Sequence, residues 1–224
     1  AFCMDGAKVA FCDVDVIKGN LLSKQTNARF FEADVKNEEA LEHTMRVLFD
    51  EWGDIDVIVN NAGISEFSPI TETTVAEFDK ILATNLRPAF ITSRLLAVHR
   101  SLQTEANPYG RIINIASTRY LMSEPHSEGY AASKGGIVGM TLPIARECAD
   151  YGIRVATIAP GLFETPLMAG LPATVKEGMA SGVPFPRRLG RPVEFARMVL
   201  HVIENIMLNG CCIRLDGALR MPPK

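Results

Sequence analysis

The chain has 224 residues, of which 47% are hydrophobic and 22% are charged, and its formal net charge is −3 at pH 7. This length suits one α/β domain with a sizeable core, and the absence of a basic run argues against nucleic acid or an anionic membrane as a partner. No apolar stretch approaches the roughly 20 residues needed to cross a bilayer, and the start does not resemble a signal peptide. The five cysteines are odd in number and the four histidines are scattered, so we expect reduced thiols in a cytoplasmic protein and no metal site.

The predicted elements alternate between short apolar runs and helical segments. The runs predict strands at 8–13, 28–35, 56–63, 111–116, 153–159 and 211–215. Helices are predicted at 16–26, 37–52, 130–150 and 192–205, and a longer helical region at 74–104. The segment 165–182 has no strong periodicity, and we predict a mobile flap there. The alternation predicts a Rossmann-like, doubly wound parallel sheet in one domain spanning residues 1–224.

Four residues predict where the helices begin, end or bend. Asn37 can cap the second helix, and Gly53 ends it. Pro88 predicts an irregularity near Asn85 in the long helical region, because proline lacks the backbone N–H that a helix interior needs. Pro143 predicts a bend or a local break in the helix over 130–150 for the same reason.

Tyr130, Lys134 and Ser117 could together form a device for proton transfer. Tyr130 and Lys134 are four residues apart, which places them on one helix face. A lysine ammonium there favours the phenolate and lowers a phenol pKa that is normally about 10. Ser117 follows a buried strand, at the carboxyl end where sites of open α/β sheets form, and its hydroxyl can hold a substrate oxygen. The pair alone is more often a solvated helix face, so the neighbouring motifs decide its meaning.

Two further motifs lie at predicted strand ends. Asp13 ends the first strand, where an acid can bind the ribose hydroxyls of adenosine and repel a 2′-phosphate. A helix cap is the commoner role for such an aspartate. Asn60-Asn61-Ala62-Gly63 offers two amides and a glycine that permits close approach, although a glycine-containing turn is the commoner explanation of such a motif alone.

These motifs, in this order, resemble those of the short-chain dehydrogenase/reductases over the whole chain. The resemblance implies that Tyr130 is the general acid/base, that Lys134 assists it and holds the nicotinamide ribose, that Ser117 orients the substrate oxygen, and that Asn85 holds a water. It implies an NAD cofactor, a small alcohol or ketone substrate and a homotetramer with the helices around 85–104 and 130–150 in its interface. It also assigns cofactor contacts to Asp13, Asp34, Val35, Asn61, Ala62, Gly63, Tyr130, Lys134, Pro160, Phe163 and Thr165.

The carboxyl-terminal third resembles the type 2 3-hydroxyacyl-CoA dehydrogenases, a group that includes the type 10 17β-hydroxysteroid dehydrogenase. Residues 134–146, 157–163 and 213–218 carry this likeness. It implies an NAD-dependent interconversion of a secondary alcohol and a ketone on a 3-hydroxyacyl-CoA or a hydroxysteroid-like substrate. The segments 63–69 and 117–125 resemble generic bacterial members, which keeps a 3-oxoacyl carrier-protein reductase and a sugar or polyol dehydrogenase open as alternatives. A non-catalytic binding protein is a further alternative.

Two features remain outside these roles. Arg119 and Glu124 lie close to Ser117 and could bind a polar substrate, although solvated loop charges are the commoner explanation. The family opens with a strand and a glycine-rich loop that binds pyrophosphate, whereas this sequence begins at Ala1 in what resembles the tail of the following helix. We therefore expect about 20 further residues in the native protein, and we expect the sheet to lack a strand between those ending at Asp13 and Asn60.

Overall fold

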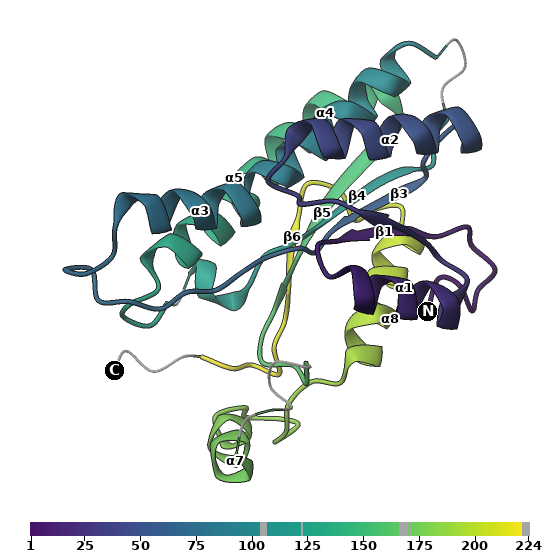
Figure 1. Ribbon diagram of the computed structural model, residues 1–224. Helices are drawn as coiled ribbons and strands as arrows, with labels where there is room; N and C mark the ends of the chain where they lie inside the picture. Colours follow the sequence, from purple (N-terminus) through teal and green to yellow (C-terminus); the bar gives the residue numbers. More distant parts are fainter. Residues whose placement is uncertain (104–106, 122, 166–169, 171, 221–224) are drawn as a thin grey trace.

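The computed structural model describes residues 1–103, 107–121, 123–165, 170 and 172–220, and it contains parallel strands flanked by helices (Figure 1). The strands are β1 (Ala10–Asp13), β2 (Arg29–Glu32), β3 (Val57–Asn60), β4 (Gly110–Ile115), β5 (Ile153–Pro160) and β6 (Cys212–Leu215). Strands β1 and β2 form one parallel pair, and β3, β4, β5 and β6 form a parallel sheet in that order. The predicted α/β class with a parallel sheet is confirmed.

Two apolar layers cover the four-stranded sheet, and alternate residues of β4 point to each of them. Ile112 packs with residues of α2 (Glu38–Trp52), α4 (Arg87–Ser101) and α5 (Glu128–Glu147). Its neighbour Ile113 packs on the opposite face with Val199 and Val202 of α8 (Pro192–Glu204). Both isoleucines are fully buried. Because successive side chains point to opposite faces and both faces are covered, apolar residues follow one another in β4, and the strand appears in the sequence as an apolar run.

The sheet is interrupted between β1 and β3, at the position where the family resemblance expects another strand. Helix α2, which follows β2, is joined to α4, which precedes β4: Arg94 of α4 pairs with Glu38 and Glu42 of α2, each at 3.0 Å. Phe31 of β2 packs against the core formed by α2, α4 and β4. Helix α1 (Val16–Thr26) packs on the β1–β2 pair.

Most helices begin and end where local chemistry predicts. The Asn37 side chain accepts a hydrogen bond from Ala40 N at the start of α2, and Gly53 (φ +81°) follows its last residue. The long helical region is two helices, α3 (Val75–Asn85) and α4, and Pro88 lies in the first turn of α4. There its missing N–H is one that a helix start leaves unpaired anyway.

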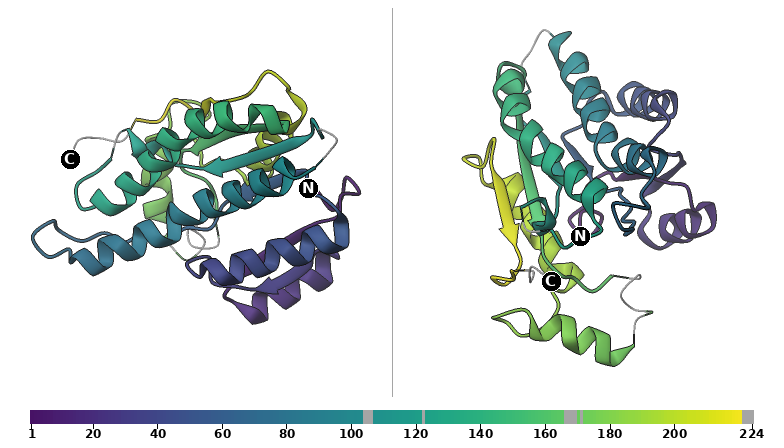
Figure 2. Two further views of the ribbon diagram at one scale, coloured as in Figure 1. Left: turned by 90° about the horizontal axis from the view of Figure 1, so that it is seen from above. Right: turned by 90° about the vertical axis from the view of Figure 1, so that its left-hand side faces the viewer.

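The structure shows what the chain does at Pro143 and in the predicted flap. Pro143 lies inside α5 without ending it, because the residues around it, including Thr141 and Ala145, are buried against the sheet and hold the helix in place. A 3-10 helix, Cys148–Tyr151, follows α5 directly. The predicted flap contains a helix, α7 (Ala173–Ser181), which lies apart from the other helices on the side where the strands end (Figure 2). Residues 166–169 and 171 of that segment lie outside the described residues.

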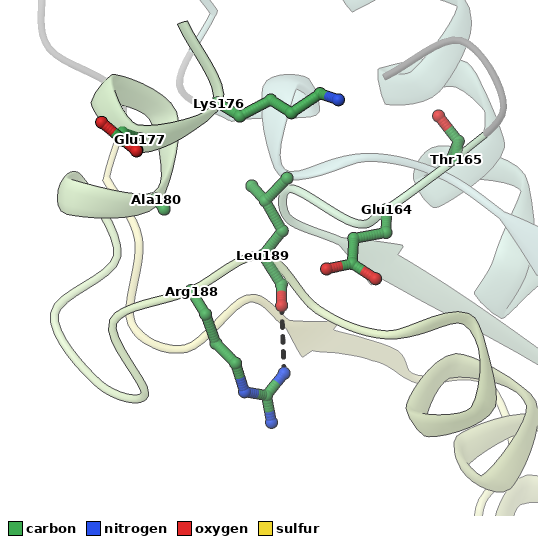
Figure 3. A pocket seen from close by; sticks show the side chains of 7 residues that line it. All are labelled: Glu164, Thr165, Lys176, Glu177, Ala180, Arg188 and Leu189. Carbon is green, nitrogen blue, oxygen red and sulfur yellow. Dashed lines mark hydrogen bonds between the residues drawn. The ribbon is translucent and has the colours of Figure 1, made fainter. Parts of the chain in front are cut away.

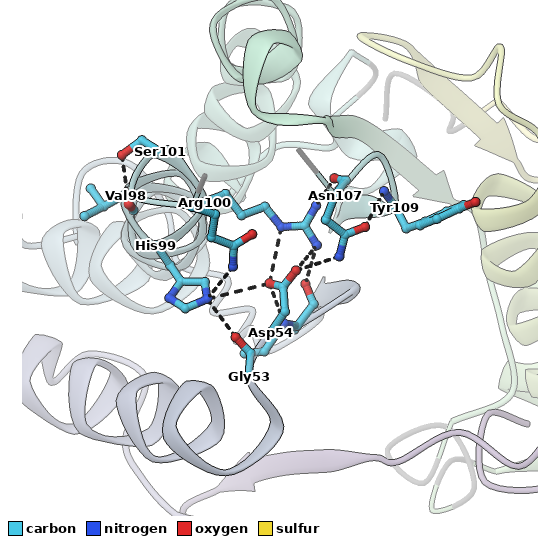
Figure 4. Close-up of polar contacts among 10 residues, drawn as sticks. Gly53, Asp54, Val98, His99, Arg100, Ser101, Asn107 and Tyr109 are labelled. Carbon is cyan, nitrogen blue, oxygen red and sulfur yellow. Dashed lines mark hydrogen bonds and ion pairs between the residues drawn. The ribbon is translucent and has the colours of Figure 1, made fainter. Parts of the chain in front are cut away.

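A polar network lies at the amino ends of β3 and β4 (Figure 4). Arg100 is buried at the end of α4, and its guanidinium contacts Asp54 at 2.9 Å and donates to the carbonyl oxygens of Ile55 and Asn107. The Asn107 amide donates to Asp54 at 2.7 Å. These bonds fix the segments that lead into β3 and β4. The candidate active site lies at the other, carboxyl ends of these strands.

Candidate active site

Helix α5 carries Tyr130 and Lys134 on one face. It can lie close to α3 because Gly129 has no side chain, and a Cβ there would be 3.0 Å from Ile81 Cδ1. Tyr130 is half-buried and Lys134 is buried, with Nζ 5.7 Å from the centre of the tyrosine ring. The predicted pair therefore lies on adjacent turns of one helix, with the tyrosine at the more accessible position.

Lys134 is held away from water. Its Nζ donates to Ile115 O, the carbonyl of the last residue of β4, at 2.8 Å. Burial lowers the pKa of Lys134 from 10.5 to about 8. At neutral pH the ammonium form still dominates, and a positive charge one turn from Tyr130 stabilises a phenolate there.

Asn85 joins this pair at the end of α3. Its side chain is buried, accepts from Ile64 N at 2.8 Å and donates to Ile64 O at 2.9 Å. A Cβ on Gly63 would lie 3.2 Å from Asn85 Oδ1 and 3.5 Å from Lys134 Nζ. The loop after β3 at Gly63, the asparagine and the lysine therefore meet at one point.

Ser133 is a polar residue of this cluster that the sequence analysis missed. Its hydroxyl donates to Tyr130 O at 2.7 Å and accepts from Asn85 Nδ2 at 3.1 Å. It is fully buried. Its position three residues after Tyr130, on the same helix face, was the available signal. Ser133 connects the asparagine to the backbone of the tyrosine.

Ser117 follows β4 and begins a 3-10 helix, Thr118–Tyr120, that packs against α5. Its Oγ accepts a hydrogen bond from Arg119 N at 3.3 Å, so its own proton is available to donate. The register pairs Ile115 with Ile158 of β5, which places Ser117 at the carboxyl edge of the sheet. The residues around Pro160 lie at the same edge.

The residues assigned to the adenosine end lie beside the β1–β2 pair. Asp13 is exposed at the end of β1, and its carboxylate accepts from Asp15 N at 2.9 Å. Asp34 pairs with Lys36 at 3.3 Å, and Val35 beside it is half-buried. Residues 61–63, which include Asn61 and Ala62, are exposed after β3.

Phe163 and Thr165 follow β5. The backbone of Phe163 pairs with Gly190 in an isolated bridge, and its ring meets Phe195 edge-on at 5.9 Å. Thr165 lines a cavity of about 410 Å³ below α7 (Figure 3). Its other lining residues are Glu164, Lys176, Glu177, Ala180, Arg188 and Leu189. The flap thus adds an open cavity next to the end of β5.

The residues of this edge fit a nicotinamide dinucleotide. An exposed carboxylate at the end of β1 suits ribose hydroxyls. The exposed residues 61–63 offer backbone groups to a ligand, and Gly63 lets Asn85 and the buried Lys134 lie close behind them. Among the described residues there is no cluster of three or more histidine, cysteine, aspartate or glutamate side chains that could hold a metal ion. In the same part of the chain, no helix is long and apolar enough to span a membrane.

Comparison with known proteins agrees with this geometry. A family model described as enoyl-(acyl carrier protein) reductase matches residues 1–217. The human 3-hydroxyacyl-CoA dehydrogenase type-2 is 42% identical over 97% of this chain and 87% of its own length. The chain belongs to the short-chain dehydrogenase/reductase family. It is therefore an oxidoreductase of the family that uses a nicotinamide dinucleotide.

Other members of the short-chain dehydrogenase/reductase family extend the comparison. A 3-oxoacyl-[acyl-carrier-protein] reductase of Thermotoga maritima is 30% identical over 97% of this chain and 89% of its own length. The crystal structure of a 3-hydroxyacyl-CoA dehydrogenase type-2 from Mycobacterium avium has a TM-score of 0.91 and 29% identity, covering 99% of this chain and 90% of that one. The structure of ElxO with NADP bound has a TM-score of 0.86 and 25% identity, covering 96% and 90%.

Proposed function

We propose that this oxidoreductase interconverts a 3-hydroxyacyl-CoA and the corresponding 3-oxoacyl-CoA, with NAD as its cofactor. The observation that carries the proposal is the Tyr130–Lys134 pair on α5, with the buried amino group 5.7 Å from the tyrosine ring. The similarity to 3-hydroxyacyl-CoA dehydrogenases of type 2 supports the substrate class.

Each residue of the cluster has one role in the proposed reaction. Tyr130 exchanges a proton with the substrate oxygen, and Lys134 stabilises the phenolate that results. Ser117 donates its free proton to the same oxygen and holds it beside the phenol. Asn85 fixes the loop after β3 through its two bonds to Ile64. A nicotinamide dinucleotide held by these residues would supply the hydride chemistry at the substrate carbon.

The preference for NAD over NADP rests on Asp13. Its exposed carboxylate ends β1, and the next residues are Val14 and Asp15, so no cation follows it directly. A 2′-phosphate placed there would meet negative charge. The NADP-bound relative makes this a necessary measurement. We expect Asp13→Ser to raise the Michaelis constant for NAD and lower that for NADP.

The decisive assay follows NADH absorbance with acetoacetyl-CoA. We expect turnover by the wild-type protein and a loss of at least about 100-fold in kcat for Tyr130→Phe, since general acid–base catalysis contributes 10²–10⁴-fold. Tyr109→Phe is the matched control, because Tyr109 is exposed just before β4, at the other end of the sheet. Turnover by Tyr130→Phe at the wild-type rate would contradict the assigned role.

The same assay separates the alternatives. Faster reduction of a 3-oxoacyl carrier-protein thioester would favour the second candidate function, which the Thermotoga relative supports. A hydroxysteroid and a panel of sugars and polyols test the remaining candidate substrate classes. If no carbonyl compound is reduced, a non-catalytic binding role replaces the proposal.

For assembly we propose a homotetramer that uses α4 and α5. Both helices expose large apolar side chains, namely Phe90 and Val98 on α4 and Leu142 on α5. Light scattering of the wild type and of Phe90→Asp tests the assembly, and a wild-type monomer would refute it.

We also propose a cytoplasmic location, which the five free cysteines support.

A further inference from the structure

Two charged residues near Ser117 form a half-buried ion pair stacked on an aromatic ring. Arg119 Nη2 and Glu124 Oε2 are 2.7 Å apart, and the side chains are only 17% and 33% exposed. The guanidinium carbon lies 4.7 Å from the centre of the Phe67 ring, in the loop after β3. We call Arg119, Glu124 and Phe67 the Arg119 clasp.

The clasp is continuous with the backbone that holds Ser117. Arg119 N donates to Ser117 Oγ at 3.3 Å, so the same residue forms the ion pair and orients the serine hydroxyl. Arg119 O accepts from Ser123 Oγ at 2.8 Å, which closes the loop on itself. A shift of Arg119 therefore moves the group that fixes the direction of the serine oxygen.

The other end of the clasp reaches the helix of Tyr130. Ser127 is buried and immediately precedes α5, and its hydroxyl donates to Glu124 O at 2.6 Å. The loop after β3 is tied to the same place, because Ser68 N donates to His126 O at 3.2 Å. Contacts thus run without interruption from the serine, through the ion pair, to the start of the helix that carries the tyrosine.

The environment makes this pair stronger than an exposed one. A surface ion pair contributes little to stability because water competes for both charges, whereas a charge-assisted bond shielded from water and stacked on a ring has less competition from solvent. The other ion pair of the loop after β3, between Glu66 and Lys80, is more exposed, with side chains 39% and 53% accessible. Solvated loop charges would not combine a ring contact, a bond to the serine and a connection to α5.

We propose that Arg119 is a positioning residue that, through its pair with Glu124 and its contact with Phe67, sets the Ser117 hydroxyl against Tyr130. The proposal rests on the proposed function, in which both hydroxyls hold one substrate oxygen. Positioning predicts a loss in kcat. Direct binding of an anionic substrate group by Arg119 instead predicts a rise in KM with an unchanged kcat.

The kinetic test uses Arg119→Met and Glu124→Gln, with Lys80→Met as the matched control that breaks the neighbouring ion pair. We expect kcat for acetoacetyl-CoA to fall about 10- to 100-fold in the first two, because small misplacements of reacting groups have effects of this size. In a Ser117→Ala background the Arg119 change should cost about twofold or less, since nothing is left to position. Exchanging the two charges, Arg119→Glu with Glu124→Arg, should restore part of the loss.

Hydrogen exchange of the protein without ligands gives a readout independent of turnover. The amides of residues 118–121 should exchange faster in Arg119→Met and Glu124→Gln and should be unchanged in Lys80→Met. Unchanged exchange, additive losses with Ser117→Ala, or a change in KM alone would each overturn the proposal. If the wild type reduces no carbonyl compound, the proposed function fails, and faster exchange would still show that the clasp holds the loop.

Discussion

Lys134 gives the sharpest test of the electrostatics, because its amino group is buried and, within the described part of the chain, pairs with no carboxylate. A pKa lowered from 10.5 to about 8 means that the folded chain binds this proton less tightly than the unfolded chain, by about 3 kcal/mol. Below pH 8 both states are protonated, and the full cost of burying the ammonium is present. Between pH 8 and 10.5 the unfolded chain holds more protons, so this contribution makes the protein more stable as the pH rises.

The perturbation is Lys134→Met, which keeps much of the side-chain length and removes the charge. We expect the difference in unfolding free energy, variant minus wild type, to be about 3 kcal/mol larger at pH 7 than at pH 10.5. Urea unfolding of both proteins at several pH values measures it. Titrating groups that do not interact with Lys134 cancel in the difference, and a Tyr130→Phe background removes the titrating neighbour that does.

A second variant controls for the loss of any lysine. Lys24 is exposed in the last turn of α1, so Lys24→Met should give a difference that does not change with pH over this range. Parallel stability curves for Lys134→Met and the wild type would refute the reasoning, because they would mean that the buried amino group keeps its ordinary pKa.

Three further substitutions test packing around the site and below it. Gly63→Ala should lower kcat for acetoacetyl-CoA about 10-fold with little change in KM, because its methyl would crowd Asn85 Oδ1 at 3.2 Å. Gly190→Ala should destabilise the protein by about 1–3 kcal/mol in urea unfolding, because the new methyl would lie 2.5 Å from the Phe163 ring. Arg100→Met should cost about 3 kcal/mol in the same assay, because it leaves a largely buried carboxylate unpaired; a loss below 1 kcal/mol would contradict this.

Local chemistry made much of the fold predictable. Asn37 and Gly53 mark the ends of α2 because a side-chain cap and a left-handed backbone position have few substitutes. The placement of the candidate site residues was predictable for a similar reason: one helical turn fixes Tyr130 relative to Lys134, and the end of a strand places Ser117.

What could not be predicted depends on contacts between distant segments. Helix α7 has no buried residues, so its sequence shows no apolar stripe. The pair of Arg119 and Glu124 was visible as two nearby charges, but its value depends on Phe67, which lies some 50 residues away in the sequence. Ser133 shares the helix face of Tyr130, but its bond to Asn85 joins residues 48 positions apart, and the sequence does not show such a contact.

The backbone bonds on either side of the flap have a consequence for how this protein can change. Glu164 N donates to Gly190 O and Gly190 N donates to Leu162 O, both at 2.8 Å, so the segment between them leaves the body and returns to it at one place. A surface segment whose two ends are joined by such bonds can vary in length and composition with little effect on the stability of the sheet and its helices. A segment transplanted from another member of the family between these residues should alter the shape of the 410 Å³ cavity while β5 and α8 keep their positions. The length and composition of this segment can therefore change while the elements that carry Ser117, Tyr130 and Lys134 stay as they are.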